Sequence, residues 1–442
     1  MFQYPNTLLQ EVREKWQKRK YPGEHVPPLP SDDILSRMLE VAYHASFLTE
    51  EGRRLGFRVA YLPQDDATKR EEEAFPGRMR PIALSKPRDF SVGELLRLAP
   101  ATDPTKVLIC VEPLRGVRDL QSLAIWGLLD AGSSWWNFVH GESSEGIPPP
   151  NCFTISSTRP GHLSVSRVGL ILATLSNGRI VAPTEDIFYE GPIGAFFEPP
   201  GKALYNDVVT LLGTKRFDPE GQDDNYPQRR YVEYLERVLF HVRDSRHGGM
   251  LIVVRDELTE ADSRLTDRVS IKYPSSYDIE WDLLARALVG HTRYYELWNQ
   301  LWDGKEPLTA DKFQEFHMVE SGNEDLEVAI ADSVKFIASL SGVDGAIAIT
   351  DRLRVIGFGV EITALSPTVT RIKAVSDSAG KSGEWISIDT YGTRHRSAIR
   401  FCSSYEESVA FVVSQDGGVK AVKRVGSEVL LWPDINVGFF GI

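Results

Sequence analysis

Asp344-Gly345-Ala346 and Gly392-Thr393-Arg394-His395-Arg396 are the two stretches from which the fold of the C-terminal half can be predicted. An apolar run that predicts a buried strand follows the first, and the second opens a predicted helix. Glycine has no Cβ, so the backbone beside Asp344 leaves room for a ligand. A carboxylate suited to a divalent cation, together with a basic helix start suited to phosphate, predicts a site for nucleotide chemistry.

The basic motif is unfavourable as a bare surface turn. Positive side chains in the first turn of a helix oppose the helix dipole unless an anion binds there. The alternative is an ion-paired turn, but the nearest acids in the sequence are Asp389 and Glu406. We therefore favour an anion site at residues 392–396.

A third element follows the predicted strand 409–413. Ser414 and Gln415 lie next to the pair Gly417-Gly418, where a hydroxyl and an amide at a strand end would complete a phosphate or base pocket. Taken alone, the same residues are typical of a hairpin turn.

The C-terminal part, residues 231–442, predicts a mixed β-sheet covered by helices. We expect strands at 346–349, 355–362, 386–388, 409–413 and 419–422. Residues 275–322 are rich in aromatic and charged side chains and predict a mostly helical insertion. Residues 214–230 are polar, contain two prolines and predict a linker.

Residues 1–213 predict a separate α/β domain. Helices are expected from Asn6 to Lys20 and from about Ser31 to Arg54, with buried strands near 58–62 and 106–111. The apolar run 116–136 predicts a long helix. The whole chain is thus an α/β protein of two domains.

Bulk properties restrict the function. The 442 residues carry a net charge of −12, which argues against a general nucleic-acid binder. The three cysteines, Cys110, Cys152 and Cys402, lie in or beside apolar stretches, as buried thiols of a reducing compartment do. No apolar run predicts a signal peptide or a membrane span, so we expect a cytoplasmic protein with no membrane partner.

Residues 229–442 resemble the diadenylate cyclase domain, the nucleotidyltransferase module that makes cyclic di-AMP. That family is marked by a DGA motif and by a GTRHR motif followed by a helix, and both are intact here. His247-Gly248-Gly249 and the strand after it are similar to the start of some cyclase domains. Val343 stands where some members carry a metal-binding histidine. Residues 1–210 are similar to sensor-type regions fused to such cyclases.

The resemblance implies a role for each motif. Asp344 would bind the divalent metal, Mg²⁺ or Mn²⁺, and help to deprotonate the ribose 3′-hydroxyl. Arg394, His395 and Arg396 would be catalytic by holding the triphosphate and stabilising charge at the α-phosphorus. Ile362 is expected to pack on adenine. The residues expected to bind the nucleotide are Gly345, Ala346, Ile362, Gly392, Thr393, Ser414 and Gln415.

The implied reaction condenses two ATP into cyclic di-AMP and two pyrophosphates. Because the product is two-fold symmetric and one domain offers one pocket, we expect two copies to meet face to face in a homo-oligomer. The N-terminal domain would control the reaction. The alternative is a catalytically inactive sensor that binds nucleotide in the same pocket.

Overall fold

The computed structural model describes residues 4–18, 25–50, 53–54, 56–67, 79–104, 106–114, 122–130, 150–157, 160–176, 178–181, 187–214, 225–245, 247–302, 309–364, 369–415, 418–433, 435 and 437. The chain forms two compact units, Met1–Pro183 with Gly438–Ile442, and Thr184–Val437. We call them the N-terminal unit and the C-terminal unit.

The N-terminal unit contains a mixed sheet of strand order β10-β9-β8-β7-β3-β5-β6-β4. Only β3 and β5 pair in parallel among its described strands. The strands are β3 Phe57–Tyr61, β4 Arg80–Asp89, β5 Val107–Pro113, β6 Leu123–Asp130, β7 Thr154–Ser157, β8 Leu163–Arg167, β9 Leu170–Ser176 and β10 Arg179–Val181. A separate short ribbon pairs β1 Thr49–Glu50 with β2 Arg53–Arg54.

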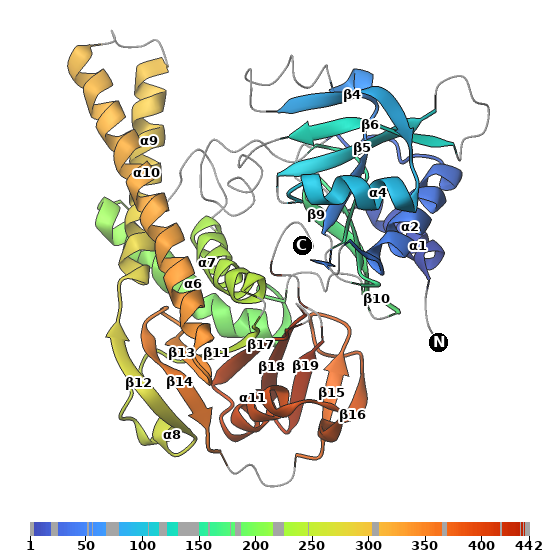
Figure 1. The fold of residues 1–442 in the computed structure, drawn as a ribbon. Coiled ribbons are helices and arrows are strands. Elements are labelled where there is room, and N and C mark those ends of the chain that lie inside the picture. Colours follow the sequence, from blue (N-terminus) through green and yellow to red (C-terminus); the bar gives the residue numbers. More distant parts are fainter. Residues whose placement is uncertain are drawn as a thin grey trace. The chain divides into compact units, whose positions relative to one another are not determined.

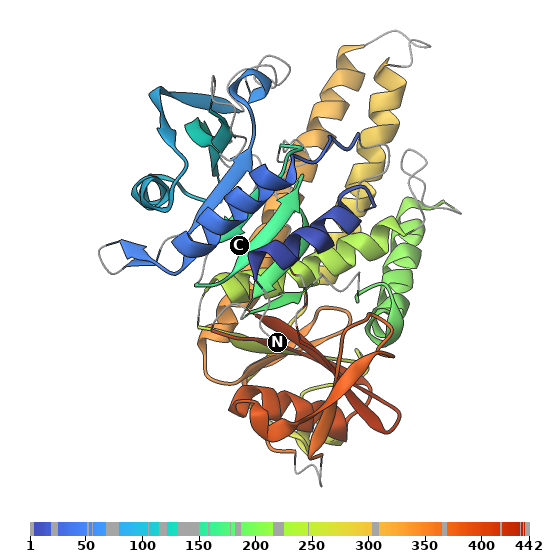
Figure 2. The same cartoon turned by 90° about the vertical axis from the view of Figure 1, so that its right-hand side faces the viewer.

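Helices cover one face of this sheet (Figure 2). They are α1 Pro5–Trp16, α2 Asp32–Ser46 and α4 Val92–Leu98, the last continued by a short 3-10 turn, Ala99–Ala101. Leu8, Leu35 and Leu39 of these helices pack with inward residues such as Val59 and Ile109 in one apolar cluster. Apolar side chains at helical spacing therefore meet apolar side chains at alternate strand positions.

The C-terminal unit contains a second mixed sheet, of order β12-β14-β13-β11-β17-β18-β19-β15-β16. Its central strand β11 pairs in parallel with β13 and antiparallel with β17. The strands are β11 Gly249–Val254, β12 Val269–Tyr277, β13 Ala346–Thr350, β14 Val355–Ile362, β15 Arg371–Val375, β16 Gly383–Ser387, β17 Ser408–Val413, β18 Val419–Val425 and β19 Glu428–Trp432.

Helices lie on both faces of this sheet (Figure 1). One face packs on α6 Gly191–Leu212, α7 Tyr226–Asp244, α9 Glu280–Trp302 and α10 Ala310–Ser339. The other face packs on α11 Thr393–Ser404, with the short helix α8 Ser263–Thr266 nearby. Burial on both faces explains why the central strands are almost wholly apolar, as in Met250–Val254 and Ala346–Ile349.

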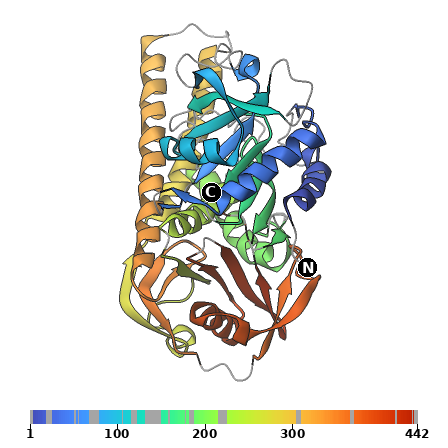
Figure 3. The same cartoon turned by 45° about the vertical axis from the view of Figure 1, so that its right-hand side comes forward.

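The pair α9 and α10 forms a long antiparallel hairpin (Figure 3, yellow and orange). At its base, Arg230 of α7 makes an ion pair with Glu327 of α10, 2.7 Å between Nη2 and Oε2. After α10, the 3-10 turn Leu340–Gly342 connects the helix to Asp344. The hairpin thus positions the first motif.

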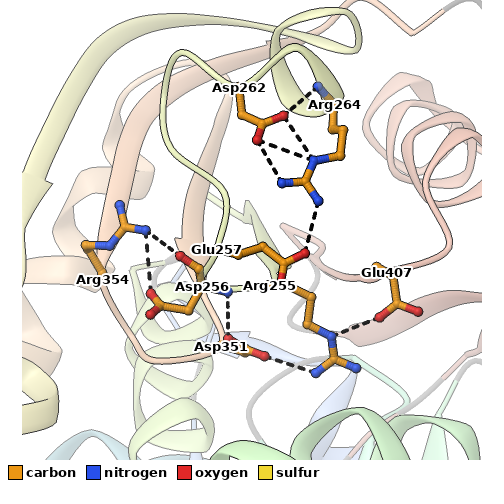
Figure 4. Close-up of polar contacts among 8 residues, drawn as sticks. All are labelled: Arg255, Asp256, Glu257, Asp262, Arg264, Asp351, Arg354 and Glu407. Atoms are coloured by element: carbon orange, nitrogen blue, oxygen red, sulfur yellow. Dashed lines mark hydrogen bonds and ion pairs between the residues drawn. The ribbon is translucent and has the colours of Figure 1, made fainter.

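A charged network ties together the end of the sheet at which β11 and β13 finish (Figure 4). The Asp351 carboxylate accepts hydrogen bonds from Arg255 Nη1, at 3.0 Å, and from the Asp256 backbone N–H, at 2.9 Å. Arg255 also bonds Glu407 and the Phe196 carbonyl oxygen, at 2.9 and 3.0 Å. Because Phe196 belongs to α6, the network fixes that helix to the sheet.

The two-domain α/β fold and the mixed C-terminal sheet are confirmed. The helix predicted over 116–136 is wrong where the chain is described, since 123–130 form the buried strand β6. The structure divides the chain near residue 183, whereas we placed the boundary at 213. Helix α6 lies in the C-terminal unit because its Phe196 and Phe197 pack on Phe411 and Tyr231.

The predicted linker and insertion also differ in extent. Most of 214–230 lies outside the described residues, and α7 already begins at Tyr226. The expected insertion 275–322 corresponds to the end of β12, to α9 and to the first part of α10. Its second helix, α10, continues past residue 322 to Ser339, so the insertion has no separate end.

Candidate functional site

Four strands bring the predicted motifs to one end of the C-terminal sheet, which we call the motif end. β11 and β13 are parallel and both begin there, with Leu251 opposite Ile347. β17 is antiparallel to β11, and its last residue, Val413, pairs with Gly249. β14 also finishes at this end, where Val360 pairs with Ala346. Segments far apart in the sequence therefore meet because of the strand order.

Asp344 is exposed at the start of β13. Within the described residues its carboxylate makes no hydrogen bond or ion pair, so its charge is open to a ligand. Gly345 has φ +123°, and a Cβ there would lie 2.6 Å from the carbonyl carbon of Gly359 in β14. Only glycine fits this close approach, and it holds Asp344 at the motif end.

The N-terminus of α11 also lies at the motif end. Arg394 Nη1 donates to the Val413 carbonyl oxygen, 3.5 Å away. A Cβ on Gly248, which has φ +68°, would come within 2.6 Å of the same Nη1. Gly248 therefore leaves the space that the guanidinium fills, beside the ends of β11 and β17. The cation is held there by a neutral carbonyl, and its charge remains available to an anion.

His395 and Arg396 of the basic motif are half-buried beside this helix start. The His395 ring packs near Tyr391, with 5.4 Å between centroids. Among the described residues the Arg396 side chain has no hydrogen bond or ion pair. The helix cap is Gly392, and Thr393 is the first helical residue. Thr393 therefore does not cap the helix, and this exposed residue can offer its hydroxyl to a ligand.

The remaining predicted residues surround the same strand ends. Ser414 N–H donates to the Gly418 carbonyl oxygen at 2.8 Å, closing the connection between β17 and β18, and Gln415 is exposed. Ile362, at the end of β14, packs partly against the apolar cluster beneath α11. Ala346 is buried in that cluster, so only its backbone can reach a ligand.

His247 lies at this end, and we gave it no role from the sequence. Its Nδ1 is 2.7 Å from the Gly248 carbonyl oxygen. A carbonyl only accepts hydrogen bonds, so Nδ1 is the donor in this contact. A Cβ built on Gly342, two residues before Asp344, would lie 4.0 Å from Nε2. The position of His247 directly before the strand β11 was the sequence signal that could have suggested a role for it.

The residues at this end fit a divalent cation that arrives with phosphate. No group of three or more His, Cys, Asp or Glu suited to a metal occurs in the part of the chain that is described. Mg²⁺ is commonly held by one or two carboxylates, waters and substrate phosphates, whereas a closed protein cage needs more ligands. The single carboxylate of Asp344 matches the arrangement in which waters and substrate phosphates supply the other ligands.

Comparison with known proteins gives a family match within the N-terminal unit. Residues 24–130 match the family described as "Probable sensor domain DACNV". The expected similarity to a sensor-type region is thereby confirmed for these residues. No curated protein matches the chain. Among the described helices, none is both long and apolar enough to cross a membrane.

Proposed function

We propose that the C-terminal unit is a diadenylate cyclase that condenses two ATP into cyclic di-AMP and that the N-terminal unit controls it. The observation that carries the proposal is that Asp344 and the Arg394 helix start lie at the same end of the sheet. A free carboxylate and a free basic helix terminus form the two halves of a nucleotide triphosphate site.

Each ATP undergoes the same displacement. The ribose 3′-oxygen of one nucleotide forms a bond to the α-phosphorus of the other, the bond from that phosphorus to the β-phosphate oxygen breaks, and pyrophosphate leaves. As the new bond forms, the 3′-hydroxyl passes its proton to solvent water with the help of the Asp344 carboxylate. A divalent cation held with the phosphates would supply positive charge opposite the leaving pyrophosphate.

The chain's own groups have separate tasks in this proposal. Asp344 would hold the cation, and its carboxylate orients the 3′-hydroxyl. Arg394, Arg396 and the free N–H groups of α11 bind the triphosphate, where charge-assisted bonds are strongest. Gly345 lets the nucleotide approach the backbone, and Gly248 leaves the space that the Arg394 guanidinium fills. The match of residues 24–130 to a probable sensor domain supports control of this reaction by a signal.

One observation favours a second candidate, a nucleotide-binding sensor without catalysis. Asp344 is a single carboxylate, and no described group of three metal-binding side chains accompanies it. A binder needs the arginines and the helix terminus but no catalytic cation.

Product analysis separates the two candidates. The purified chain is incubated with ATP and Mn²⁺ or Mg²⁺, and the products are resolved by mass spectrometry. We expect cyclic di-AMP from the wild type, and its loss from Asp344→Asn with ATP binding largely retained. Asp325→Asn, an exposed acid on α10, is the matched control and keeps activity. ATP binding with no cyclic dinucleotide from the wild type under any metal would favour the sensor.

A further inference from the structure

The sheet of the N-terminal unit has two different faces. Val59, Ile109, Ile155 and Val165 point to the face that packs on the helices. The positions between them point to the other face, because side chains alternate along a strand. Several of these are polar and fully enclosed, which is unusual for a buried sheet.

Four polar residues on this face, three of them fully enclosed and Thr174 half-buried, form a continuous row across four adjacent strands. Arg58 of β3 pairs with Ser156 of β7, Ser156 with Ser164 of β8, and Ser164 with Thr174 of β9. We call them the polar row. Paired residues share a face, so the guanidinium and three hydroxyl groups lie on one surface. Arg58 is only 2% exposed, and Ser156 and Ser164 are each 1% exposed.

This burial is costly for the fold. Burial lowers the pKa of Arg58 to about 9, and the nearby Asp103 only partly opposes that change. The Ser156 hydroxyl oxygen is buried and has no hydrogen-bond partner among the described residues. The Ser164 and Thr174 hydroxyls bond each other at 3.0 Å. The enclosed Ser156 hydroxyl therefore costs stability, and an apolar residue of similar size would avoid that cost.

We propose that the polar row binds a small ligand through a negatively charged oxyanion, a phosphate or a carboxylate. The planar guanidinium of Arg58 matches either group in a two-pronged contact. Ser156 donates its unused hydroxyl hydrogen to an anionic oxygen, and Ser164 and Thr174 contact the ligand's remaining polar atoms. The site is distinct from the nucleotide site of the C-terminal unit and does not depend on its activity.

The location suits a sensor. Arg58 lies within residues 24–130, which match the probable sensor domain, whereas the three hydroxyl residues lie beyond them. The ligand site therefore needs both the matched segment and the strands that follow it.

Isothermal titration calorimetry of the full chain tests the proposal. Arg394→Ala with Arg396→Ala serves as the background, because it removes the basic site of the C-terminal unit. The probes are inorganic phosphate and acetate at millimolar concentration, with chloride at equal ionic strength as the reference. Ser156→Ala and Arg58→Met are added to this background. Ser157→Ala is the matched control, since Ser157 pairs with Phe57 of the helix-packed face.

We expect one anion to bind per chain in the background variant. Ser156→Ala should weaken this binding by about tenfold, the effect of losing one hydrogen bond to a charged group. It should not lower the melting temperature, because the lost hydroxyl had no described partner. Arg58→Met should abolish binding, and Ser157→Ala should leave it unchanged. Binding of phosphate alone or of acetate alone would support the site and identify its anion.

Two results would overturn the proposal. One is that neither anion binds the background variant. The other is that binding is the same after Ser156→Ala. Since Ser156→Ala removes only a hydroxyl, this variant still decides the question if Arg58→Met fails to fold.

Discussion

Arg394 and Val413, nineteen positions apart in the chain, meet at the motif end, where the guanidinium donates to the Val413 carbonyl oxygen at 3.5 Å. The contact fixes the side chain without cancelling its charge, because a carbonyl carries no net charge. An acid in the same place would have neutralised the cation. The geometry therefore favours Arg394 as a phosphate ligand over a structural ion pair.

Arg394→Ala should weaken ATP binding. One charge-assisted contact to phosphate contributes about 1.5–3 kcal/mol, so we expect a rise in Kd of roughly ten- to a hundredfold. Arg400→Ala is the matched control, because Arg400 is exposed further along α11. Titration of the chain with ATP and Mg²⁺ measures both. Equal affinities for the two variants would show that Arg394 does not contact the nucleotide.

Gly345→Ala should damage both stability and activity. The φ of +123° and the 2.6 Å approach to the Gly359 carbonyl carbon leave no place for a methyl group. We expect a loss of about 2 kcal/mol or more in the free energy of unfolding. Gly392→Ala should cost under about 1 kcal/mol, because no atom lies within 4 Å of a Cβ there. Urea denaturation compares them, and equal losses would contradict the steric explanation.

The Asp344 and Arg394 motifs could be recognised from the sequence because each consists of consecutive residues with a chemistry of its own. It did not predict that Arg394 reaches Gly248 and Val413, since that contact depends on the pairing of Gly249 with Val413. The strand β6 was mistaken for a helix for a related reason. Its residues Leu123 to Trp126 are buried on both faces, so neither strand nor helix periodicity is visible in the sequence.

His291 should make the stability of the C-terminal unit sensitive to acid. It packs between Tyr226 and Tyr295, with centroid distances of 5.5 and 4.6 Å. Burial, followed by the charge of Arg230, lowers its pKa from 6.5 to about 4. As the pH falls from 6.5 to 4, the unfolded chain takes up a proton that the folded chain refuses, so stability is lost over this range.

His291→Phe should reduce that loss, since phenylalanine keeps the ring contacts and cannot titrate. We expect the difference in unfolding free energy between pH 6.5 and pH 4 to shrink by about 2 kcal/mol, allowing for partial solvation of the site. Urea unfolding at several pH values measures this. An unchanged pH dependence in the variant would refute the assignment.

Arg255→Ala should destabilise the end of the sheet opposite the motif end. The substitution leaves the buried Asp351 carboxylate without its cation and removes the bond to Phe196 of α6. Removal of one partner from a buried pair is costly, and we expect about 2 kcal/mol because the Arg255 side chain keeps 22% exposure.

Arg264→Ala is the control for this prediction. Arg264 pairs with Asp262 and Glu257 (Figure 4). These pairs lie at the surface, where the Arg264 side chain is 48% exposed. Exposed pairs contribute little. Thermal unfolding should therefore distinguish the two variants clearly, and similar melting temperatures would mean that the Asp351 network does not secure α6.

Cyclic di-AMP synthesis by this chain should depend on its concentration. The proposed reaction needs two ATP molecules, and each C-terminal unit has one Asp344 and one Arg394 helix start. Two copies must therefore face each other, so that each 3′-hydroxyl meets the other nucleotide's α-phosphorus. The basic helix starts repel one another until nucleotide and cation neutralise them, which favours assembly only with both bound.

If the productive pair is transient, the rate of cyclic di-AMP synthesis should rise faster than linearly with protein concentration. Activity measured over a dilution series, alongside sedimentation with and without ATP, tests this. Constant specific activity from a chain that sediments as a monomer throughout would contradict the two-copy mechanism.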